Sequence, residues 1–273
     1  MTQTIPEDER WLVALDIDGT LLTHRGDVAP EVIVAVAEVA ARGHEVMLAT
    51  GRAIVETLPV LRDLNIWPEY LVCSNGAMVL KRDPLADGGY AKHKVETFRP
   101  GDVLSLVKEH LPAGKYAVED ELGDYYYTEP IPGVDPLITA HQVPFEELFD
   151  LRATRVVVVS PDHETEEFLD IVQRIGLQHV SYAIGWASWL DIAPDGVTKA
   201  SALENVRESL GIPRSRIFAA GDGNNDMDML KWAGELGRAV AMGNAEDDVK
   251  AVATEVTDSV DDLGIVNALS TLP

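Results

Sequence analysis

The chain has a single cysteine, a shortage of basic residues and no long apolar run. Because Cys73 is alone, no disulfide bond can form within the chain. Its neighbours from Tyr70 to Val72 are apolar, which favours an inert core thiol over a catalytic nucleophile. No stretch of about 18 uncharged apolar residues is present to span a bilayer. Residues 1–10 are polar and acidic, unlike a signal peptide. We therefore expect a soluble, cytoplasmic protein.

The shortage of positive charge narrows the choice of partners. The chain carries 22 Lys and Arg against 46 Asp and Glu, a formal net charge of −24. So acidic a protein is a poor candidate for binding nucleic acid or an anionic membrane surface. A small anionic ligand remains compatible with this charge, because one site can be positive while the whole chain is negative. The length of 273 residues predicts two domains or one large one.

Strands and helices alternate in the first and last parts of the chain, which favours a parallel α/β sheet. Apolar residues at helical spacing follow Pro30, and a second helix is expected through Leu58 and Leu61, where Pro59 should kink or split it. The expected strands of this sheet lie at 11–15, 45–49, 70–73, 78–80, 216–220 and 239–242. Further helices are expected through Leu203, Met229 and Leu269.

The middle of the chain has a different pattern of predicted helices and strands. Residues 81–89 are rich in turn-forming types and are predicted to be a linker. The segment that follows mixes helices and strands, including a β-branched strand at 155–159, and is long enough for a small α+β domain. We therefore expect a core built from 1–81 and 189–273, interrupted by an inserted domain at 82–188.

Two acids stand at the end of the first predicted strand. Asp16 and Asp18 follow the apolar run 11–15 and precede Gly19 and Thr20. If the strand continues that far, both side chains start on the same side. Carboxylates so close repel each other unless positive charge lies between them. A metal cation and a phosphoryl group would supply that charge. The alternative is a polar turn with two solvated acids.

Other polar groups recur at predicted strand ends, where open parallel sheets bind ligands. They are Thr50 with Gly51, Lys199, and the cluster Asp222, Asn225 and Asp226. A carboxylate can attack phosphorus, and Mg²⁺ can be held by one or two carboxylates, for which Asp16 and Asp222 are the obvious pair. A second acid can serve as the proton donor and acceptor, a role that suits Asp18. Lys199 and the Thr50–Gly51 pair would then contact the phosphate.

Six motifs occur in a fixed order along the chain. They are DIDGTL at Asp16–Leu21, ATGR at Ala49–Arg52, SNGA at Ser74–Ala77, GVTKASAL at Gly196–Leu203, GDGNNDM at Gly221–Met227 and AMGNA at Ala241–Ala245. This ordered set resembles the haloacid dehalogenase (HAD) superfamily of phosphatases, and most closely its Cof-type branch. The resemblance implies a Rossmann-like parallel sheet with helices on both faces, and an inserted α+β cap domain.

The resemblance also implies roles for individual residues. Asp16 would be the nucleophile and a magnesium ligand, and Asp18 the general acid/base with its backbone carbonyl on the metal. Asp222 would ligate the metal, while Asp226 would support the metal or its waters. The residues implied in substrate or phosphate binding are Thr50, Gly51, Lys199, Asn225, Arg52 and Asn75. For the last two, a plain salt bridge and a plain turn are equally good interpretations.

The implied activity is Mg²⁺-dependent hydrolysis of small phosphorylated metabolites, with sugar phosphates the leading class, through an aspartyl-phosphate. Two alternatives stay open: a sugar phosphomutase, and a non-catalytic regulator that binds a phosphorylated ligand. Several polar and aromatic residues of the inserted domain are expected to be structural, not substrate contacts, because aromatic residues in alternating runs usually belong to a core. These are Glu119, Asp120, Tyr125, Tyr126, Tyr127 and Trp186.

Overall fold

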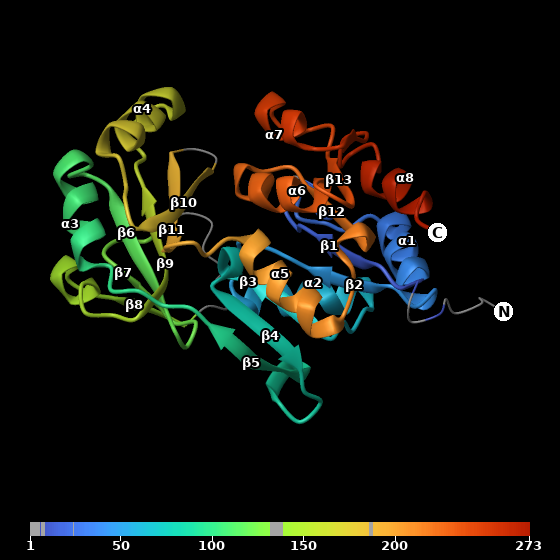
Figure 1. Cartoon of the computed structure of the whole chain (residues 1–273). Helices are drawn as coiled ribbons and strands as arrows, with labels where there is room; N and C mark the ends of the chain where they lie inside the picture. Colours follow the sequence, from blue (N-terminus) through green and yellow to red (C-terminus); the bar gives the residue numbers. More distant parts are fainter. Residues whose placement is uncertain (1–5, 7–8, 24, 132–138, 186–187) are drawn as a thin grey trace.

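The computed structural model describes residue 6 and the ranges 9–23, 25–131, 139–185 and 188–273. Figure 1 shows an α/β core that contains both ends of the described chain, and a smaller domain beside it. No helix in the described ranges is long and apolar enough to cross a membrane. Trp186, expected to be structural, lies outside the described residues.

The core is built on a five-stranded parallel sheet in the order β14-β13-β12-β1-β2. Its strands are β1 (Leu12–Leu15), β2 (Glu45–Leu48), β12 (Ile217–Gly221), β13 (Arg238–Ala241) and β14 (Glu255–Val256). Every residue of β1 is buried, as expected for a central parallel strand covered on both faces. The carboxyl ends of β1 and β12 therefore lie side by side.

Helices cover both faces of this sheet. Because side chains alternate along β1, Val13 and Leu15 pack on one face, while Leu12 and Ala14 pack on the other. The first face is covered by α1 (Pro30–Ala41), α2 (Ile54–Leu64) and α8 (Gly264–Ser270). The second face is covered by α5 (Lys199–Leu210), α6 (Met227–Gly234) and α7 (Asp247–Val252). The predicted Rossmann-like core is confirmed.

Helix α2 runs as one helix through Pro59, so the expectation that this proline splits it is wrong, whereas the expected kink stays a prediction. Proline removes one backbone hydrogen bond from a helix interior. Burial of Val60, Leu61 and Leu64 against the sheet offsets that loss. The Glu56 carboxylate also accepts a hydrogen bond from the backbone N–H of Ala53, the residue that precedes the helix. Tertiary packing therefore prevails over the local preference of proline.

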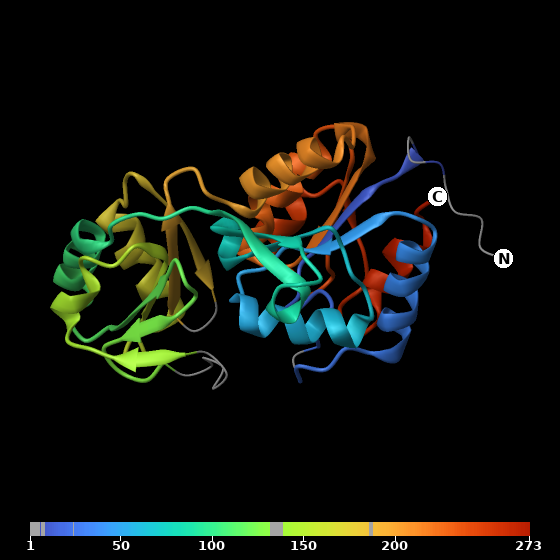
Figure 2. The ribbon, with the colours of Figure 1, turned by 90° about the horizontal axis from the view of Figure 1, so that it is seen from below.

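The smaller domain holds a six-stranded sheet in the order β10-β11-β9-β6-β7-β8, antiparallel except for the β7–β8 pair. Helices α3 (Gly101–His110) and α4 (Thr165–Ile175) pack on one face. They lie at the end of the molecule away from the core (Figures 1 and 2). The strands are β6 (Lys115–Asp120), β7 (Tyr125–Tyr127), β8 (Ala140–Gln142), β9 (Ala153–Val159), β10 (Val180–Gly185) and β11 (Trp189–Pro194). The inserted α+β cap is thereby confirmed.

Strand pairing bears on the expected cap bounds of 82 and 188. Strand β4 (Met78–Arg82) pairs with both β3 (Tyr70–Cys73) and β5 (Tyr90–Val95), so the expected linker at 81–89 lies at a hairpin turn. Strand β11 pairs with β9 and β10 and therefore belongs to the cap sheet. Turn-forming residues mark hairpins as readily as linkers, and a buried apolar strand has the same sequence pattern in either domain. From strand pairing, we propose a cap of about residues 96–194.

Candidate active site

Asp16 and Asp18 diverge in the structure. Strand β1 ends at Leu15, and the backbone N–H of Asp16 donates to the Ala220 carbonyl at 3.0 Å. Beyond it the chain turns, because the amides of Leu21 and Leu22 both donate to the Ile17 carbonyl. The Asp16 side chain is buried, whereas that of Asp18 is 62% exposed. The strand does not continue to Asp18, so the two carboxylates occupy different environments.

Lys199 lies fully buried between two acids from distant parts of the chain. It is the first residue of α5, and Thr198 caps this helix. Its Nζ donates to Asp16 Oδ1 at 2.6 Å and to Asp226 Oδ1 at 2.7 Å. Although burial disfavours the charged lysine, the two carboxylates raise the pKa of Lys199 above its ordinary value. Lys199 therefore stays positive at the floor of the site.

Three carboxylates meet at this point. Oxygen atoms of Asp16, Asp222 and Asp226 all lie within 4.8 Å of one another. Burial and the Asp226 carboxylate raise the pKa of Asp16 well above its ordinary value and that of Asp222 to about 7. Three carboxylates share a single lysine, so the cluster has an excess of negative charge. Because all of its ligand atoms are oxygens, it fits a hard divalent cation such as Mg²⁺.

Both carboxylate oxygens of Asp226 accept hydrogen bonds from other residues. Its Oδ2 accepts hydrogen bonds from the backbone N–H groups of Asp222 and Gly223, and its Oδ1 binds Lys199. These contacts fix the loop that follows β12. Asp226 is therefore placed to support the cluster, while Asp16 and Asp222 present oxygens to an ion.

The Asp18 carboxylate forms a two-point pair with Arg52. The Arg52 Nε donates to Asp18 Oδ2 at 2.9 Å, and Nη2 donates to Oδ1 at 2.6 Å. Of the two interpretations left open for Arg52, the structure has the salt bridge. The Asp18 side chain is not among the three clustered carboxylates, which agrees with a metal contact through its backbone carbonyl only.

The residues expected to contact phosphate form a second wall of the site. Thr50 is buried, and its carbonyl accepts from the backbone N–H of Asn75 at 3.0 Å. The Asn225 side-chain amide donates to Asn75 Oδ1, also at 3.0 Å. A Cβ atom at position 51 would lie 3.0 Å from Asn75 Oδ1, so glycine at this position avoids a close contact with Asn75. The structure thus brings Thr50, Gly51, Asn75 and Asn225 together.

Asn244 is a site residue that the sequence did not single out. Its Nδ2 donates to Asp222 Oδ2 and to the Gly19 carbonyl, both at 2.9 Å, and its Oδ1 accepts from the backbone N–H of Val260. Asn244 therefore ties the loop after β1 to Asp222. Its place in the AMGNA motif was the available signal, but the motif alone gave it no role.

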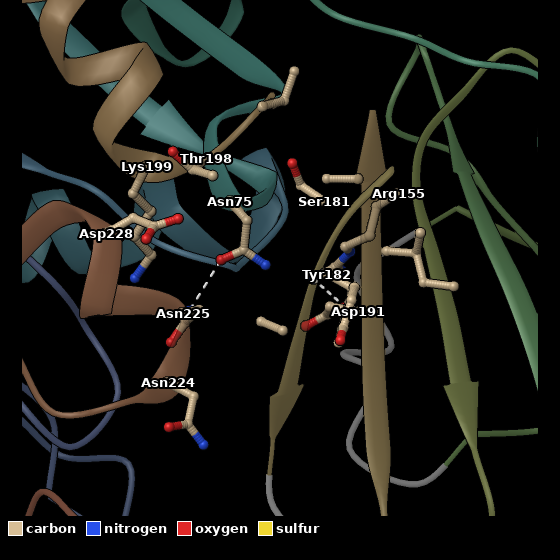
Figure 3. Close-up of a pocket in the computed structure, with 14 residues that line it drawn as sticks. Asn75, Arg155, Ser181, Tyr182, Asp191, Thr198, Lys199, Asn224, Asn225 and Asp228 are labelled. Atoms are coloured by element: carbon tan, nitrogen blue, oxygen red, sulfur yellow. Dashed lines mark hydrogen bonds and ion pairs between the residues drawn. The ribbon is translucent and has the colours of Figure 1, made fainter. Parts of the chain in front are cut away.

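A pocket opens between the core and the cap (Figure 3). On the core side Lys199, Asn75 and Asn225 line it, and on the cap side Arg155 and Asp191. These two cap residues were not predicted, because a strand pattern does not show which face meets the core. Of the cap residues expected to be structural, Glu119, Asp120 and Tyr125 are buried, and Tyr126 and Tyr127 are partly buried.

Comparison with known proteins agrees with this geometry. Residues 13–269 match the family model of haloacid dehalogenase-like hydrolases. The chain is 27% identical to the 5-amino-6-(5-phospho-D-ribitylamino)uracil phosphatase YitU of Bacillus subtilis, covering 96% of this chain and 97% of that protein. It is 29% identical to the pyridoxal phosphate phosphatase YbhA of Escherichia coli, covering 91% and 95%.

The fold recurs among solved structures as well. A haloacid dehalogenase-like hydrolase from B. subtilis superposes with a TM-score of 0.80 at 24% identity, covering 96% of this chain and 99% of that one. The family match spans the core strands, the cap and the clustered acids. The chain therefore belongs to the haloacid dehalogenase-like hydrolases, and within them it is a phosphatase of the HAD type.

Proposed function

We propose that the protein is a Mg²⁺-dependent phosphomonoesterase that acts on small phosphorylated metabolites through an aspartyl-phosphate. The observation that carries the proposal is the buried Asp16 carboxylate. It is held at 2.6 Å by Lys199 and lies within 4.8 Å of Asp222 and Asp226, beside a pocket that the cap covers. Sugar phosphates are the leading class, and the names of YitU and YbhA support small metabolites as substrates.

The cluster would hold magnesium through Asp16, Asp222 and the backbone carbonyl of Asp18, with Asp226 fixing the loop behind it. A bound Mg²⁺ offsets the negative charge that the carboxylates and a phosphoryl group bring together. The remaining positive charge comes from Lys199, whose side chain cannot move far because both of its acidic partners are buried. The donors that surround the phosphoryl group are Lys199, Thr50, the Gly51 amide, Asn225 and Asn75.

The reaction proceeds in two displacements. In the first, an Asp16 oxygen forms a bond to phosphorus, the bond to the leaving oxygen breaks, and Asp18, which enters this step in its protonated form, gives that oxygen its proton. In the second, Asp18 takes a proton from water, the water oxygen bonds to phosphorus, and the bond to Asp16 breaks. Phosphate and the original Asp16 carboxylate are released.

Arg52 sets the starting position of Asp18. The pair at 2.6 and 2.9 Å holds the Asp18 carboxylate at the exposed rim, so its proton-transfer role requires it to leave Arg52 and turn toward the substrate. Arg52 is then released to meet the phosphorylated substrate. This exchange joins the two interpretations of Arg52, as a salt-bridge partner and as a substrate contact.

The test is phosphate release from a panel of phosphorylated sugars, nucleotides and cofactors, with magnesium and with EDTA. We expect magnesium-dependent release from small phosphomonoesters and none from Asp16→Asn, whose fold is checked by circular dichroism. An isomerised sugar phosphate in place of free phosphate would instead identify a phosphomutase. Normal turnover by Asp16→Asn would contradict the assignment of the nucleophile.

A further inference from the structure

A row of polar side chains crosses the face of the cap sheet that meets the core. Glu119 on β6 pairs with Tyr125 on β7 on one side and with Arg155 on β9 on the other. On the next strand, Asp191 lies opposite Val157, two residues from Arg155, and therefore on the same face. Three charged groups are thus placed side by side over the active site.

The guanidinium of Arg155 is enclosed by its neighbours. Its Nη1 donates to the carbonyl of Gly51 in the core, Nε lies 3.4 Å from Glu119, and Nη1 lies 3.6 Å from Asp191. The group also lies over the ring of Tyr125, 5.5 Å from its centre. Its side chain is only 9% exposed. The positive charge of Arg155 is therefore balanced by two nearby carboxylates, and little of it is exposed to a ligand.

Two carboxylates share this one cation. Glu119 is fully buried and also accepts a hydrogen bond from Ser74 Oγ of the core at 3.0 Å. Asp191 retains 20% exposure of its side chain. Glu119, Arg155 and Asp191 together form the cap wall of the pocket. Two acids and one guanidinium give this wall a formal charge of −1. Of the two acids, Asp191 is the one that meets the pocket.

The wall faces the residues that we place around the phosphoryl group. Figure 3 shows Arg155 and Asp191 on the cap strands, across the pocket from Lys199, Asn75 and Asn225. A phosphomonoester whose phosphoryl group lies at Lys199 extends its leaving group toward Asp191. Arg155 Nε, Glu119 Oε2 and Asp191 Oδ1 are buried and have no hydrogen bond among the described residues, so the polar groups of this wall are incompletely satisfied.

We propose that Asp191, positioned by Arg155, selects the leaving group by charge: it admits neutral, hydroxyl-bearing groups and rejects those with a second anionic group. This inference rests on the proposed phosphatase activity. A hydroxyl group can donate to a carboxylate that needs a partner, whereas a carboxylate or second phosphate cannot. An added anion would also face the uncompensated charge of this wall in a partly desolvated pocket.

The rest of the pocket agrees with a leaving group of mixed character. The apolar side chains of Ala183, which pairs with Asp191, and Val197 also line it. Carbon atoms of a polyol chain or ring can pack there while its hydroxyls reach Asp191. The pocket therefore combines one acceptor for orientation with apolar walls, the usual composition of a small-molecule site.

The test compares two substrates that differ only at the far end of the chain. Sorbitol 6-phosphate ends in a hydroxyl, and 6-phosphogluconate ends in a carboxylate. We expect the wild type to favour sorbitol 6-phosphate in kcat/KM by about tenfold or more. Asp191→Asn should reduce this ratio by about tenfold, chiefly by lowering KM for 6-phosphogluconate. Asp191→Glu, which keeps the charge, should retain the preference.

Glu121→Gln is the matched control, since it removes the same charge from the same domain at an exposed ion pair with Arg152. It should leave the ratio unchanged. Where turnover is slow, both compounds are also measured as inhibitors of p-nitrophenyl phosphate hydrolysis. Equal use of the two substrates by the wild type, or an unchanged ratio in a folded Asp191→Asn, overturns the inference. Absence of any p-nitrophenyl phosphate hydrolysis counts against the proposed function instead.

Discussion

The most demanding prediction concerns the buried cation. Replacing Lys199 with Met removes the positive charge while keeping an unbranched side chain of similar length. Two charge-assisted hydrogen bonds, 2.6 and 2.7 Å long, are lost, and the acids they bound stay buried. Removing one partner of a buried ion pair costs about 3–5 kcal/mol of unfolding free energy. We expect a loss in that range from Lys199→Met in metal-free buffer.

Urea unfolding in the presence of EDTA measures this loss. The control is Lys231→Met, at an exposed lysine on α6, where the unfolding free energy should change by less than about 0.5 kcal/mol. Without Lys199 the acid cluster is more negative, so added Mg²⁺ should raise the melting temperature of Lys199→Met more than that of the wild type. A loss below about 1 kcal/mol, or an equal response to magnesium, would refute the reasoning.

Three further predictions follow from individual contacts. Asn244→Leu removes the amide that orients Asp222 and should raise the magnesium concentration for half-maximal activity by about tenfold; an unchanged titration would exclude this role. Gly19→Ala adds a Cβ 2.1 Å from an Asp222 oxygen at a φ of 72°, so hydrolysis should fall by about tenfold or more, and full activity would contradict the close packing. Arginine hydrogen bonds lower the pKa of Glu204 from 4.5 to about 2, so its stabilisation is present above pH 4.5 and is lost as the pH falls toward 2. Glu204→Gln should therefore reduce the dependence of unfolding free energy on pH in that window, and an unchanged pH profile would argue against the pair.

Much of the core could be predicted because its signals are local. The apolar strands that precede Asp16 and Asp222 and their polar ends are visible in the sequence, and parallel topology then brings those ends to one edge. The exposed position of Asp18 was not predictable, because it depends on β1 ending at Leu15 and on a pair with Arg52. Neither can be inferred from two acids spaced one residue apart.

The cap shows the limit of pattern analysis. Residues 81–89 carry turn signals that a hairpin and a linker share, and only strand pairing distinguishes them. Arg155 lies in a β-branched strand whose neighbours all favour burial, so nothing local indicates that it reaches Gly51 in the core. Contacts between domains depend on long-range docking, which periodicity does not encode.

Trapping the phosphoenzyme tests the central claim most directly. The enzyme is quenched in acid during turnover of a phosphomonoester with magnesium, and its peptides are analysed by mass spectrometry. We predict a phosphorylated peptide with the modification on Asp16, none in Asp16→Asn, and slower formation and slower hydrolysis of the adduct in Asp18→Asn. Phosphate on another residue, turnover without an adduct on Asp16, or equal behaviour of the two variants would contradict the account.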